Sequence, residues 1–596
     1  MVNIVPPAAI FIIGAFLIPL LKGRLKSAYM LLLPIAAFTN ILNIPEGMHW
    51  PVRFLDYELI FGRVDRLSMI FGYIFVIISF IATLFAIRVK DDGQHVAAFL
   101  YAGSALGAIF AGDLLSLFIF WEIMAITATY LIWARRTKKS IAAGFRYLMV
   151  HIFGGLCLLV GIFIHAHNTG SIEFGFIGLN GMASYLIFLG FGINCAFPML
   201  HAWLTDAYPE ATITGTVFLS AFTTKVAVYV LARGFPGTEL LIWVGAAMTV
   251  FPIFYAVIEN DLRRVLAYSV INQVGFMVVG IGIGTELAIN GATAHAFNDI
   301  LFKALLFMSM GAVMHQTGKI KATDLGGLYK SMPITTVFCI IGAASISAVP
   351  LFSAFVSKSM VISAVAHEGM AIIWFALIFA SVGVLEHAGI KIPFFAFFSH
   401  DSGIKTTEAP LNMLLAMGIA AFLCVFIGIF PGFLYSILPY PVDYAPYTAA
   451  HVVNQLQLLF FSALAFILLL LAGIYPSERR AINIDADWPY RKGAGAFMWF
   501  INNPMAKVGT AIDRTVFDSV PSSIAWASKN PLAVLKIASD TVLLRISGSD
   551  KKARIEQRIK REKELYPGDT IKHWPVGTTV LWITLFLLVY LLVYYL

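Results

Sequence analysis

Residues 190–211 read GFGINCAFPMLHAWLTDAYPEA. An apolar segment reaches Asn194 and Pro198 and then runs into polar and helix-breaking residues. Proline removes a backbone hydrogen bond from a helix, so Pro198 predicts a break. Irregular backbone at membrane depth is tolerated only where it is buried in protein or lines a cavity. The stretch therefore predicts a broken membrane helix beside a polar cavity. His201 is then a candidate relay, or alternatively a loop histidine with ordinary partners.

The whole chain has the composition of a membrane protein. Of its 596 residues, 59% are hydrophobic and only 12% are charged, and a soluble protein could not bury so much apolar surface. Apolar runs of about 18 or more residues recur, each long enough to cross a hydrocarbon core. Because the runs do not alternate, a β-barrel is excluded. The expected fold class is an all-α polytopic membrane protein with about sixteen transmembrane helices.

Basic residues are distributed unevenly between alternate loops. Fifteen lysines and arginines fall in one set of loops, whereas the other set contains only Arg53, Arg63, Arg66 and Arg233. Cytoplasmic loops carry the excess of basic residues, so we expect both termini to lie outside the cytoplasm. This topology also accounts for the net charge of +8, and no nucleic-acid partner is expected.

The sequence contains no recognisable cofactor or metal motif. It has no P-loop for ATP and no ligand spacing typical of zinc, haem or an iron–sulfur cluster. The four cysteines lie in apolar segments without paired spacing, as expected for small buried hydrophobic residues. We therefore expect neither a cofactor nor a metal ion.

Spans and polar segments divide the chain into six expected regions. The only long polar stretch, 476–576, is partly amphipathic and is expected in the cytoplasm, along the membrane surface or a partner, or as a loose connector. The regions are 1–93 with helices 1–3, 94–236 with helices 4–8, 237–400 with helices 9–13, 401–475 with helices 14 and 15, the extension 476–576, and a C-terminal transmembrane helix in 577–596.

Two of the spans carry a proline in their middle reaches, Pro198 and Pro350. Each follows a series of regular spans, so spans four to eight and nine to thirteen can form two five-helix units. Discontinuous helices at matching places in two halves are typical of inverted repeats with polar sites at the breaks. After the first break, Asp206 and Glu210 are expected to cap the helix at 213–234, and the alternative is that they gather protons at the cytoplasmic mouth.

Several charged residues lie inside or at the edges of the apolar spans. Each is costly in hydrocarbon unless it is paired or hydrated, and so many on several helices indicate a polar path through the protein. Buried lysines and carboxylates can also exchange protons near neutral pH. These residues are Asp113, Glu122, Arg146, Lys225, Asp299, Lys303, Lys358, Glu386 and Lys391.

The sharpest cluster is HAFNDILFK, residues 295–303. His295, Asp299 and Lys303 stand at i, i+4 and i+8 and form one helical stripe roughly 12 Å long. His315 lies further along the same drifting stripe. This arrangement predicts a proton wire, and the alternative is a static ion pair between Asp299 and Lys303.

Two further lysines indicate polar contacts inside the membrane. Glu122, near the middle of its span, needs a cationic partner, and Lys225 is the candidate. Such a pair can switch during proton transfer or form a fixed salt bridge. Lys358 follows the break at Pro350, which indicates an ion path, although a lysine that snorkels to the interface is the alternative.

A last group of titratable residues is Glu386, His387 and Lys391, in the stretch EHAGIKIPFF. His387 and Lys391 share one helix face. They predict an entry or exit route for protons, and snorkelling is again the alternative for Lys391.

The motifs FIFWEIMAITATYLIW, PMLHAWLTDAYPEA, FTTKVAVY, ENDLRRVLAYSVINQVGFMVVGIG, LFKALLFMSMGAVMHQTG and LGGLYKSMP occur in this order between about residues 60 and 400. This series resembles the antiporter-like subunits shared by respiratory complex I, membrane-bound hydrogenases and Mrp-type cation/proton antiporters. The resemblance implies a fourteen-helix core of two inverted five-helix repeats with a proton path along a central charged axis. By position it implies relay roles for Glu122, Lys225, His295, Lys303 and Lys358.

Two departures from the family pattern refine the resemblance. Asn194 stands where the family usually has a lysine, which puts conduction through the first half in doubt. Asp299 stands where many relatives have histidine, which is more similar to the D-type subunit of Mrp-type Na+/H+ antiporters. The polar extension and last helix instead resemble the lateral-helix extension of one complex I subunit.

The favoured function is therefore a proton-translocating subunit of a multi-subunit sodium/proton antiporter, a secondary transporter rather than an enzyme. The alternatives are a proton-pumping subunit of a redox complex, such as complex I or a membrane-bound hydrogenase, and a structural module whose charged axis no longer conducts. Expected partners are other membrane subunits, protons, Na+ as a candidate second ion, and the lipid bilayer of a bacterial inner membrane.

Overall fold

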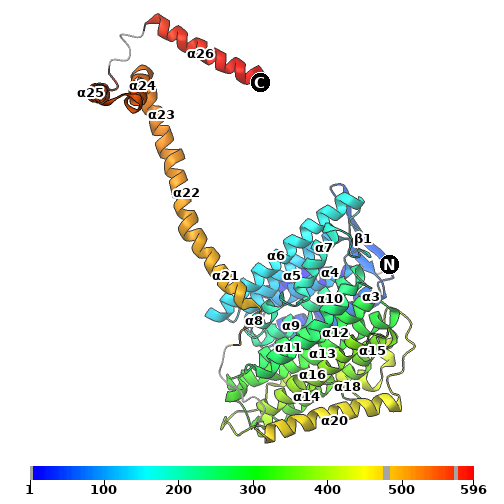
Figure 1. The fold of residues 1–596 in the computed structure, drawn as a ribbon. Helices are drawn as coiled ribbons and strands as arrows, with labels where there is room; N and C mark the ends of the chain where they lie inside the picture. Colours follow the sequence, from blue (N-terminus) through cyan, green and yellow to red (C-terminus); the bar gives the residue numbers. More distant parts are fainter. Residues whose placement is uncertain (1–4, 474–482, 569–574, 596) are drawn as a thin grey trace. The chain divides into compact units, whose positions relative to one another are not determined.

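The computed structural model describes residues 5–473, 483–568 and 575–595, most of them helical (Figure 1). The chain forms two compact units, Met1–Asp487 and Trp488–Leu596. Among the described residues, twelve helices are long and apolar enough to cross a membrane, and shorter apolar helices accompany them. A helix lies in each expected span. The polytopic helical architecture is confirmed, whereas the number of sixteen crossings stays a prediction.

The N-terminal part of the first unit contains three apolar helices and a β-hairpin. The helices are α1 (Pro7–Leu17), which continues into η1 (Ile18–Leu20), α2 (Gly23–Leu42) and α3 (Arg66–Ala86). Between α2 and α3, β1 (Gly47–Phe54) pairs with β2 (Tyr57–Val64) in antiparallel register. The hairpin corrects the all-α prediction. Most of β1 is exposed, whereas β2 buries Leu59, Gly62 and Val64 against the protein. Eight residues in each strand are fewer than a membrane-spanning strand needs.

Two sets of helices follow, one for each expected repeat. The first set comprises α4 (Asp92–Phe110), α5 (Leu114–Trp133), α6 (Lys138–Thr169), α7 (Met182–Asn194) with α8 (Ala202–Ala207), and α9 (Ile213–Ala221) with α10 (Thr223–Gly234). The second set comprises α11 (Glu239–Ile258), α12 (Leu262–Ile283), α13 (Glu286–Thr317), α14 (Pro333–Ile346) with α15 (Ser353–His367), and α16 (Ala371–Val384) with η4 (Leu385–Ile390), α17 (Lys391–Pro393) and η5 (Phe394–Phe398). The short η2 (Ala322–Asp324) and η3 (Leu328–Lys330) lie between α13 and α14.

The fourth member of each set is broken, as the two prolines predicted. The chain reads Ala196-Phe197-Pro198-Met199 after α7 and Ala348-Val349-Pro350-Leu351 after α14. In each tetrapeptide the first and last residues have positive φ, between 55° and 75°, a conformation that costs a non-glycine residue free energy and is found at functional sites. The residue before each proline donates to a carbonyl five positions earlier, at 3.0 Å in the first break and 3.1 Å in the second. The two breaks therefore share one backbone conformation.

The long third members of the two sets, α6 and α13, are each 32 residues and unbroken. Both end at a glycine with φ 70°, Gly170 and Gly318, because a left-handed residue stops the helix without a Cβ clash. Both helices are longer than the roughly 20 residues that a straight crossing needs, and neither is interrupted by a break.

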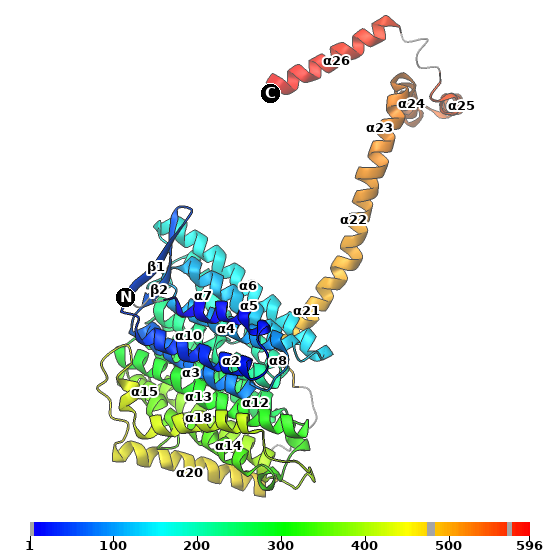
Figure 2. The same ribbon diagram turned by 180° about the vertical axis from the view of Figure 1, so that it is seen from behind.

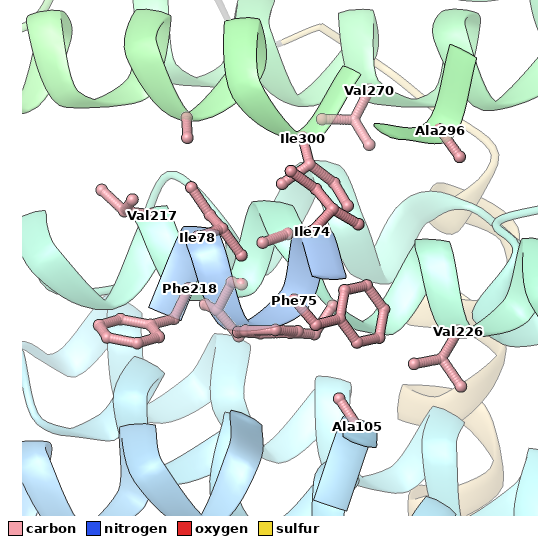
Figure 3. Close-up of a cluster of buried hydrophobic side chains, with 14 of the residues drawn as sticks. Ile74, Phe75, Ile78, Ala105, Val217, Phe218, Val226, Val270, Ala296 and Ile300 are labelled. Carbon is pink, nitrogen blue, oxygen red and sulfur yellow. The ribbon is translucent and has the colours of Figure 1, made fainter. Parts of the chain in front are cut away.

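Helix α3 lies between the two sets and joins their apolar cores. Ile74, Phe75 and Ile78 of α3 contact side chains from both sets, as Figure 3 shows. Those labelled in the figure are Ala105 of α4, Val217 and Phe218 of α9, Val226 of α10, Val270 of α12, and Ala296 and Ile300 of α13. Because lipid tails are as apolar as these side chains, their van der Waals contacts favour close packing of the two sets. One continuous apolar core therefore fixes the positions of the two helix sets relative to each other.

The first unit ends with α18 (Leu411–Ile429), the short α19 (Gly432–Tyr435) and α20 (Ala449–Leu471). Both views place α20 at the edge of the bundle (Figures 1 and 2), where it packs on α16 and η4. Most of the α20 surface is exposed in this chain.

The second unit begins with a long helix. The backbone stays helical through α21 (Asp487–Phe500), η6 (Ile501–Met505), α22 (Ala506–Asp513), η7 (Arg514–Ser519) and α23 (Val520–Lys529). Next, α24 (Pro531–Ile546) and α25 (Ser549–Leu565) pack together through a pair of Arg558 with Asp540. The last helix, α26 (Val576–Tyr595), is apolar. The residues of the expected extension that precede Asn483, 476–482, lie outside the described residues.

Candidate functional site

Three helix segments at the centre of the first unit carry polar residues that cannot reach lipid. The span from Ile213 to Gly234, which is α9 with α10, is 100% buried over its apolar window, and α12 and α13 are each 94% buried. A charged group inside them must be paired, hydrogen bonded or hydrated within the protein. The predicted relay residues on these helices therefore form an internal site.

Lys225 of α10 and Asp299 of α13 form the central ion pair. Lys225 Nζ lies 2.6 Å from Asp299 Oδ2, and both side chains are fully buried. Lys225 also donates to the carbonyl oxygen of Ser220 at 3.1 Å. The predicted pair of Lys225 with Glu122 is therefore wrong. The sequence could not show this, because the partner is chosen by how α10 and α13 pack.

Lys303 lies one turn beyond Asp299 on α13, as the stripe predicted. Its Nζ donates to the hydroxyl oxygen of Ser269 on α12, so the alternative of a static pair with Asp299 does not describe the observed contacts. A buried ammonium that faces a neutral oxygen can release its proton without separating an ion pair. Lys303 is therefore better placed than Lys225 to exchange a proton.

His295 joins three helices. One ring nitrogen, Nδ1, lies 3.1 Å from Ser357 Oγ of α15, and the other, Nε2, lies 3.1 Å from Gln273 Oε1 of α12. Gln273 and Ser269 are four residues apart on one face of α12. These two residues form a polar stripe that faces the stripe of α13. Sequence reasoning missed this second stripe, although the i, i+4 spacing was there to find it.

Lys358 lies just beyond the second break. Its Nζ donates to the carbonyl oxygen of Ile346, the last residue of α14, at 3.1 Å, and lies 4.9 Å from the centre of the Phe276 ring. The break thus supplies the lysine with a free carbonyl. The side chain is 1% exposed, so the snorkelling alternative is wrong.

A cavity of about 370 Å³ lies beside Lys358. Its wall includes polar side chains of α20, namely His451, Asn454 and Gln455. Gln455 also donates to the carbonyl oxygen of Ala348 in the break at 3.1 Å. A cavity of this size can hold several water molecules. These α20 residues were not predicted, because they come from outside the two repeats.

Lys391 caps a helix. Its Nζ donates to the carbonyl oxygens of Ala256, Val257 and Glu259, at 3.2, 2.6 and 2.7 Å, where α11 ends. The lysine is fully buried, so it does not snorkel to the interface. An amine that satisfies three terminal carbonyls stabilises the end of the helix.

The neighbours of Lys391 differ in exposure. His387 is fully buried, whereas Glu386 is half-buried in the same π-helical segment, η4. The predicted entry or exit route through these residues stays a prediction.

The first half of the site carries fewer charged groups. Glu122 of α5 faces α6, where a Cβ added to Gly155 would overlap its carboxylate. Its Oε1 is buried and has no hydrogen-bond partner among the described residues. Asn194, the last residue of α7, is fully buried, and neither amide atom has a partner there. Glu122 and Asn194 are thus two buried polar groups that the first half contributes in addition to Lys225.

His315 departs from the predicted stripe because it lies at the exposed end of α13. It lines a cavity of about 380 Å³ whose wall also includes Arg88 and Arg135. His315 is therefore separated from the buried residues of the candidate path.

Beyond the first break, two acidic residues pair with arginines. Arg146 donates to both carboxylate oxygens of Asp206, at 2.7 and 3.0 Å, and Arg135 lies 3.3 Å from Glu210. The cap of α9 is instead Thr212, which accepts from Gly215 N. The capping role predicted for Asp206 and Glu210 is therefore wrong, and Arg146 is paired with Asp206.

His201 of the first break contacts a residue that sequence reasoning did not identify. Its Nε2 lies 3.1 Å from Oδ1 of Asp485, in the segment that precedes α21. Asp485 also accepts from the Tyr268 hydroxyl group of α12 at 2.6 Å. The stretch NIDADW around Asp485 has no periodicity that would bring it to this place.

A known family matches the centre of this structure. The family model described as NADH:quinone oxidoreductase/Mrp antiporter, TM, matches residues 111–383. This range contains the Lys225–Asp299 pair, the polar stripes of α12 and α13 and both helix breaks.

Two curated relatives extend this match. The chain is 30% identical to the D subunit of the Na+/H+ antiporter of Alkalihalophilus pseudofirmus over 447 residues, which cover 69% of this chain and 89% of the relative. It is 28% identical to the A1 subunit of the Na+/H+ antiporter of Staphylococcus haemolyticus over 484 residues, which cover 71% of this chain and 60% of that relative. The chain thus spans most of the first relative and less than two thirds of the second.

A solved structure shows the same fold. A chain in the structure of the Mrp complex from Dietzia sp. DQ12-45-1b matches with a TM-score of 0.64 at 19% identity. The match covers 75% of this chain and 99% of that chain, so about a quarter of this chain lies outside the shared fold.

Proposed function

Because this chain belongs to the NADH:quinone oxidoreductase/Mrp antiporter family, we propose that it is a proton-translocating subunit of a multi-subunit Na+/H+ antiporter. It is a transporter subunit rather than an enzyme. Protons move along the buried charged axis, and the other subunits of the complex share the work of ion exchange.

The observation that supports this proposal is the buried series of titratable groups on α10, α13 and α15. Lys225 and Asp299 form a neutralised ion pair, whereas Lys303 and Lys358 donate to neutral oxygens. His295 lies on the same face of α13, with one hydrogen bond to α12 and one to α15. A purely structural axis would be expected to pair its charges, because an uncompensated buried charge costs several kcal/mol.

The contacts suggest how a proton passes. Lys303 gives its proton to water, either directly or through the Ser269 hydroxyl group, which releases its own proton to water as it accepts one, and Lys303 later takes a proton back. His295 can both donate and accept through its two ring nitrogens. Lys358 exchanges protons with the polar cavity beside α20. The Lys225–Asp299 pair changes the field at Lys303 when it opens or closes, which couples α10 of the first set to α13 of the second.

We propose a bacterial plasma membrane as the location, with both termini outside the cytoplasm. The uneven distribution of lysine and arginine between alternate loops supports this topology. A membrane-impermeant maleimide applied to intact cells tests it. A cysteine at Arg53 is expected to react and a cysteine at Lys22 is not, and the reverse pattern would contradict the topology.

A redox complex is the second candidate parent. The observation that favours it is the unit Trp488–Leu596, whose long helix from α21 to α23 and apolar α26 resemble the lateral-helix extension of a complex I subunit. In that case proton movement needs electron transfer in neighbouring subunits. Vesicles that carry the complete complex separate the two: a sodium pulse without an electron donor moves protons only in an antiporter.

The central experiment replaces the two lysines that face neutral oxygens. Lys303→Ala and Lys358→Ala, each in the complete complex, are expected to lower sodium-driven proton movement in vesicles by roughly 100-fold, the size typical of a lost proton-transfer group. Lys405→Ala is the matched control, because Lys405 is exposed. Normal assembly with full transport in both variants would overturn the proposal.

A further inference from the structure

The segment that leads into the second unit contributes a carboxylate to the first helix break. Asp485 is 9% exposed, although it lies outside the matched family region. Its Oδ1 lies 3.1 Å from His201 Nε2 and also accepts from the backbone amide of Ala486 at 2.6 Å. Its Oδ2 accepts from the Tyr268 hydroxyl group at 2.6 Å. One carboxylate therefore contacts the break of the first set and α12 of the second.

We propose that Asp485 is a positioning residue of the proton path: it fixes the ring and the tautomer of His201 at the first break, so that the extension takes part in proton transfer. This inference rests on the proposed function. It goes beyond it in assigning a role in conduction to a segment that lies outside the two repeats.

The hydrogen-bond arrangement explains how Asp485 acts. An ionised carboxylate is only an acceptor, so His201 Nε2 must carry the proton that it donates to Asp485. In the neutral ring, Nδ1 is then the acceptor. Nδ1 is buried and has no hydrogen-bond partner among the described residues, which leaves it able to take a proton from water in the break. Carboxylates that orient a histidine in this way are common around metal and catalytic sites.

Other polar groups surround Asp485 and keep it in place. Asn483 donates to Glu259 Oε2 at 3.1 Å, and Arg264 lies 3.8 Å from the same oxygen. The Tyr255 ring stacks on the Tyr268 ring with centroids 5.2 Å apart. The segment is thus attached at two points of the second helix set, through Glu259 and through Tyr268.

The ionisation state of Asp485 fits this role. Burial opposes ionisation, but the hydrogen bonds from His201, Tyr268 and the Ala486 amide, together with the attraction of His201, hold the pKa of Asp485 below its ordinary value. Asp485 is therefore ionised at neutral pH and accepts at both oxygens.

A simple strap is the competing explanation, in which Asp485 only ties the extension to the bundle. The strap and the positioning role differ in whether the negative charge of Asp485 is needed. Asparagine at this position keeps the size and a carbonyl oxygen that can accept from His201 or Tyr268, so a strap survives Asp485→Asn. The positioning role does not survive this substitution, because asparagine carries no charge. Its amide group can also donate to His201 Nε2, which favours the tautomer with the proton on Nδ1.

The test compares Asp485→Asn, Asp485→Glu and Asp513→Asn in the complete complex. Asp513 is exposed at the end of α22, so it controls for the same substitution in the extension. Sodium-driven proton movement is expected to fall about 10-fold in Asp485→Asn, as for other residues that orient a functional histidine. Asp485→Glu is expected to recover part of the rate, and Asp513→Asn to match the unmodified chain.

A second measurement does not depend on transport. Exchange of the His201 ring C2 hydrogen, followed by mass spectrometry, is expected to change at least about twofold in Asp485→Asn and not in Asp513→Asn, because this rate depends on the state of the ring. An unchanged exchange rate in Asp485→Asn overturns the positioning role. The role is also overturned if Asp485→Asn leaves the transport rate unchanged in an assay in which Lys303→Ala abolishes transport. If the unmodified complex moves no protons while the exchange rate still changes, the proposed function fails and the positioning of His201 stands.

Discussion

Ala196–Met199 and Ala348–Leu351 turn the chain through the same conformation, but the groups around the two breaks differ. The last residue of α7 is Asn194, whose side-chain amide has no partner among the described residues. The last residue of α14 is Ile346, whose carbonyl oxygen accepts from Lys358. The second break thus holds an amine from its own helix, α15. The first break instead receives a carboxylate from a segment almost 300 residues further along the chain, as the contact of His201 with Asp485 spans 284 positions.

This difference shows that the repeated backbone and the proton chemistry are separable. The break frees backbone carbonyls in either half, because the proline interrupts the helical hydrogen bonds. What the break does then depends on the side chains that reach it. In this chain His295, Asp299, Lys303 and Lys358 of the candidate path lie in the second half, and the first half is joined to them through Lys225.

The largest expected effect follows from removing the ion pair of Lys225 with Asp299, which joins the two halves. Lys225→Ala leaves Asp299 buried without its partner, which should lower the free energy of unfolding by about 3–5 kcal/mol and abolish proton movement. The thermal unfolding midpoint of the purified complex and transport in vesicles are the measurements. A Lys225→Met, Asp299→Leu double variant should recover stability but not transport. Recovery of both would mean that the pair does not take part in conduction.

The next effect concerns the carboxylate of the first half. Gly155→Ala places a methyl group where the Glu122 carboxylate lies, with its Cδ at 2.8 Å from the new Cβ. Displacing the carboxylate should reduce transport roughly 10-fold to 100-fold if its position matters. Gly154→Ala is the matched control on the same helix, because the nearest atoms to its Cβ would be those of the Ile193 side chain, at 3.3–3.4 Å. Equal transport in the two variants would remove Glu122 from the path.

A smaller effect is expected at the end of α7. Asn194→Leu makes this position apolar, like Ile346 in the second break, and removes a buried amide without partners among the described residues. Since an unsatisfied buried polar group costs about 1–3 kcal/mol, the unfolding midpoint should rise while transport stays within about twofold. A loss of transport at unchanged stability would instead show that the Asn194 amide holds water in the proton path.

The smallest effect is the dependence of the Asp485 contact on pH. Because the pKa of Asp485 is held below its ordinary value, its contribution to stability is present above about pH 4 and disappears as the pH falls through the lower value in the folded protein. Hydrogen exchange at Asn483–Asp487, corrected for its intrinsic pH dependence, should therefore show constant protection from about pH 6 to pH 9. A loss of protection already at pH 6 would contradict the ionised state assigned to this residue.

Most of the architecture followed from the sequence. Apolar runs gave the helices, Pro198 and Pro350 gave the breaks, and the four-residue spacing of α13 placed His295, Asp299 and Lys303 on one buried face. These features depend on local rules, since helix geometry fixes which residues share a face. The β-hairpin at Gly47–Val64 was missed because a short segment without clear alternation is easily taken for a loop between spans.

Partners across helices could not be read from the sequence. Lys225 is paired with Asp299 rather than Glu122, and Lys391 caps α11. The contact of Asp485 with His201 joins segments that no periodicity relates. Which groups meet is decided by the packing of α3 between the two helix sets and by the crossing of α10, α12 and α13. Helix periodicity in the sequence was enough to predict which residues are buried and which helix face they share. Their partners depend on how the helices pack, because the free energy of a buried charge depends on the atoms within a few ångströms of it.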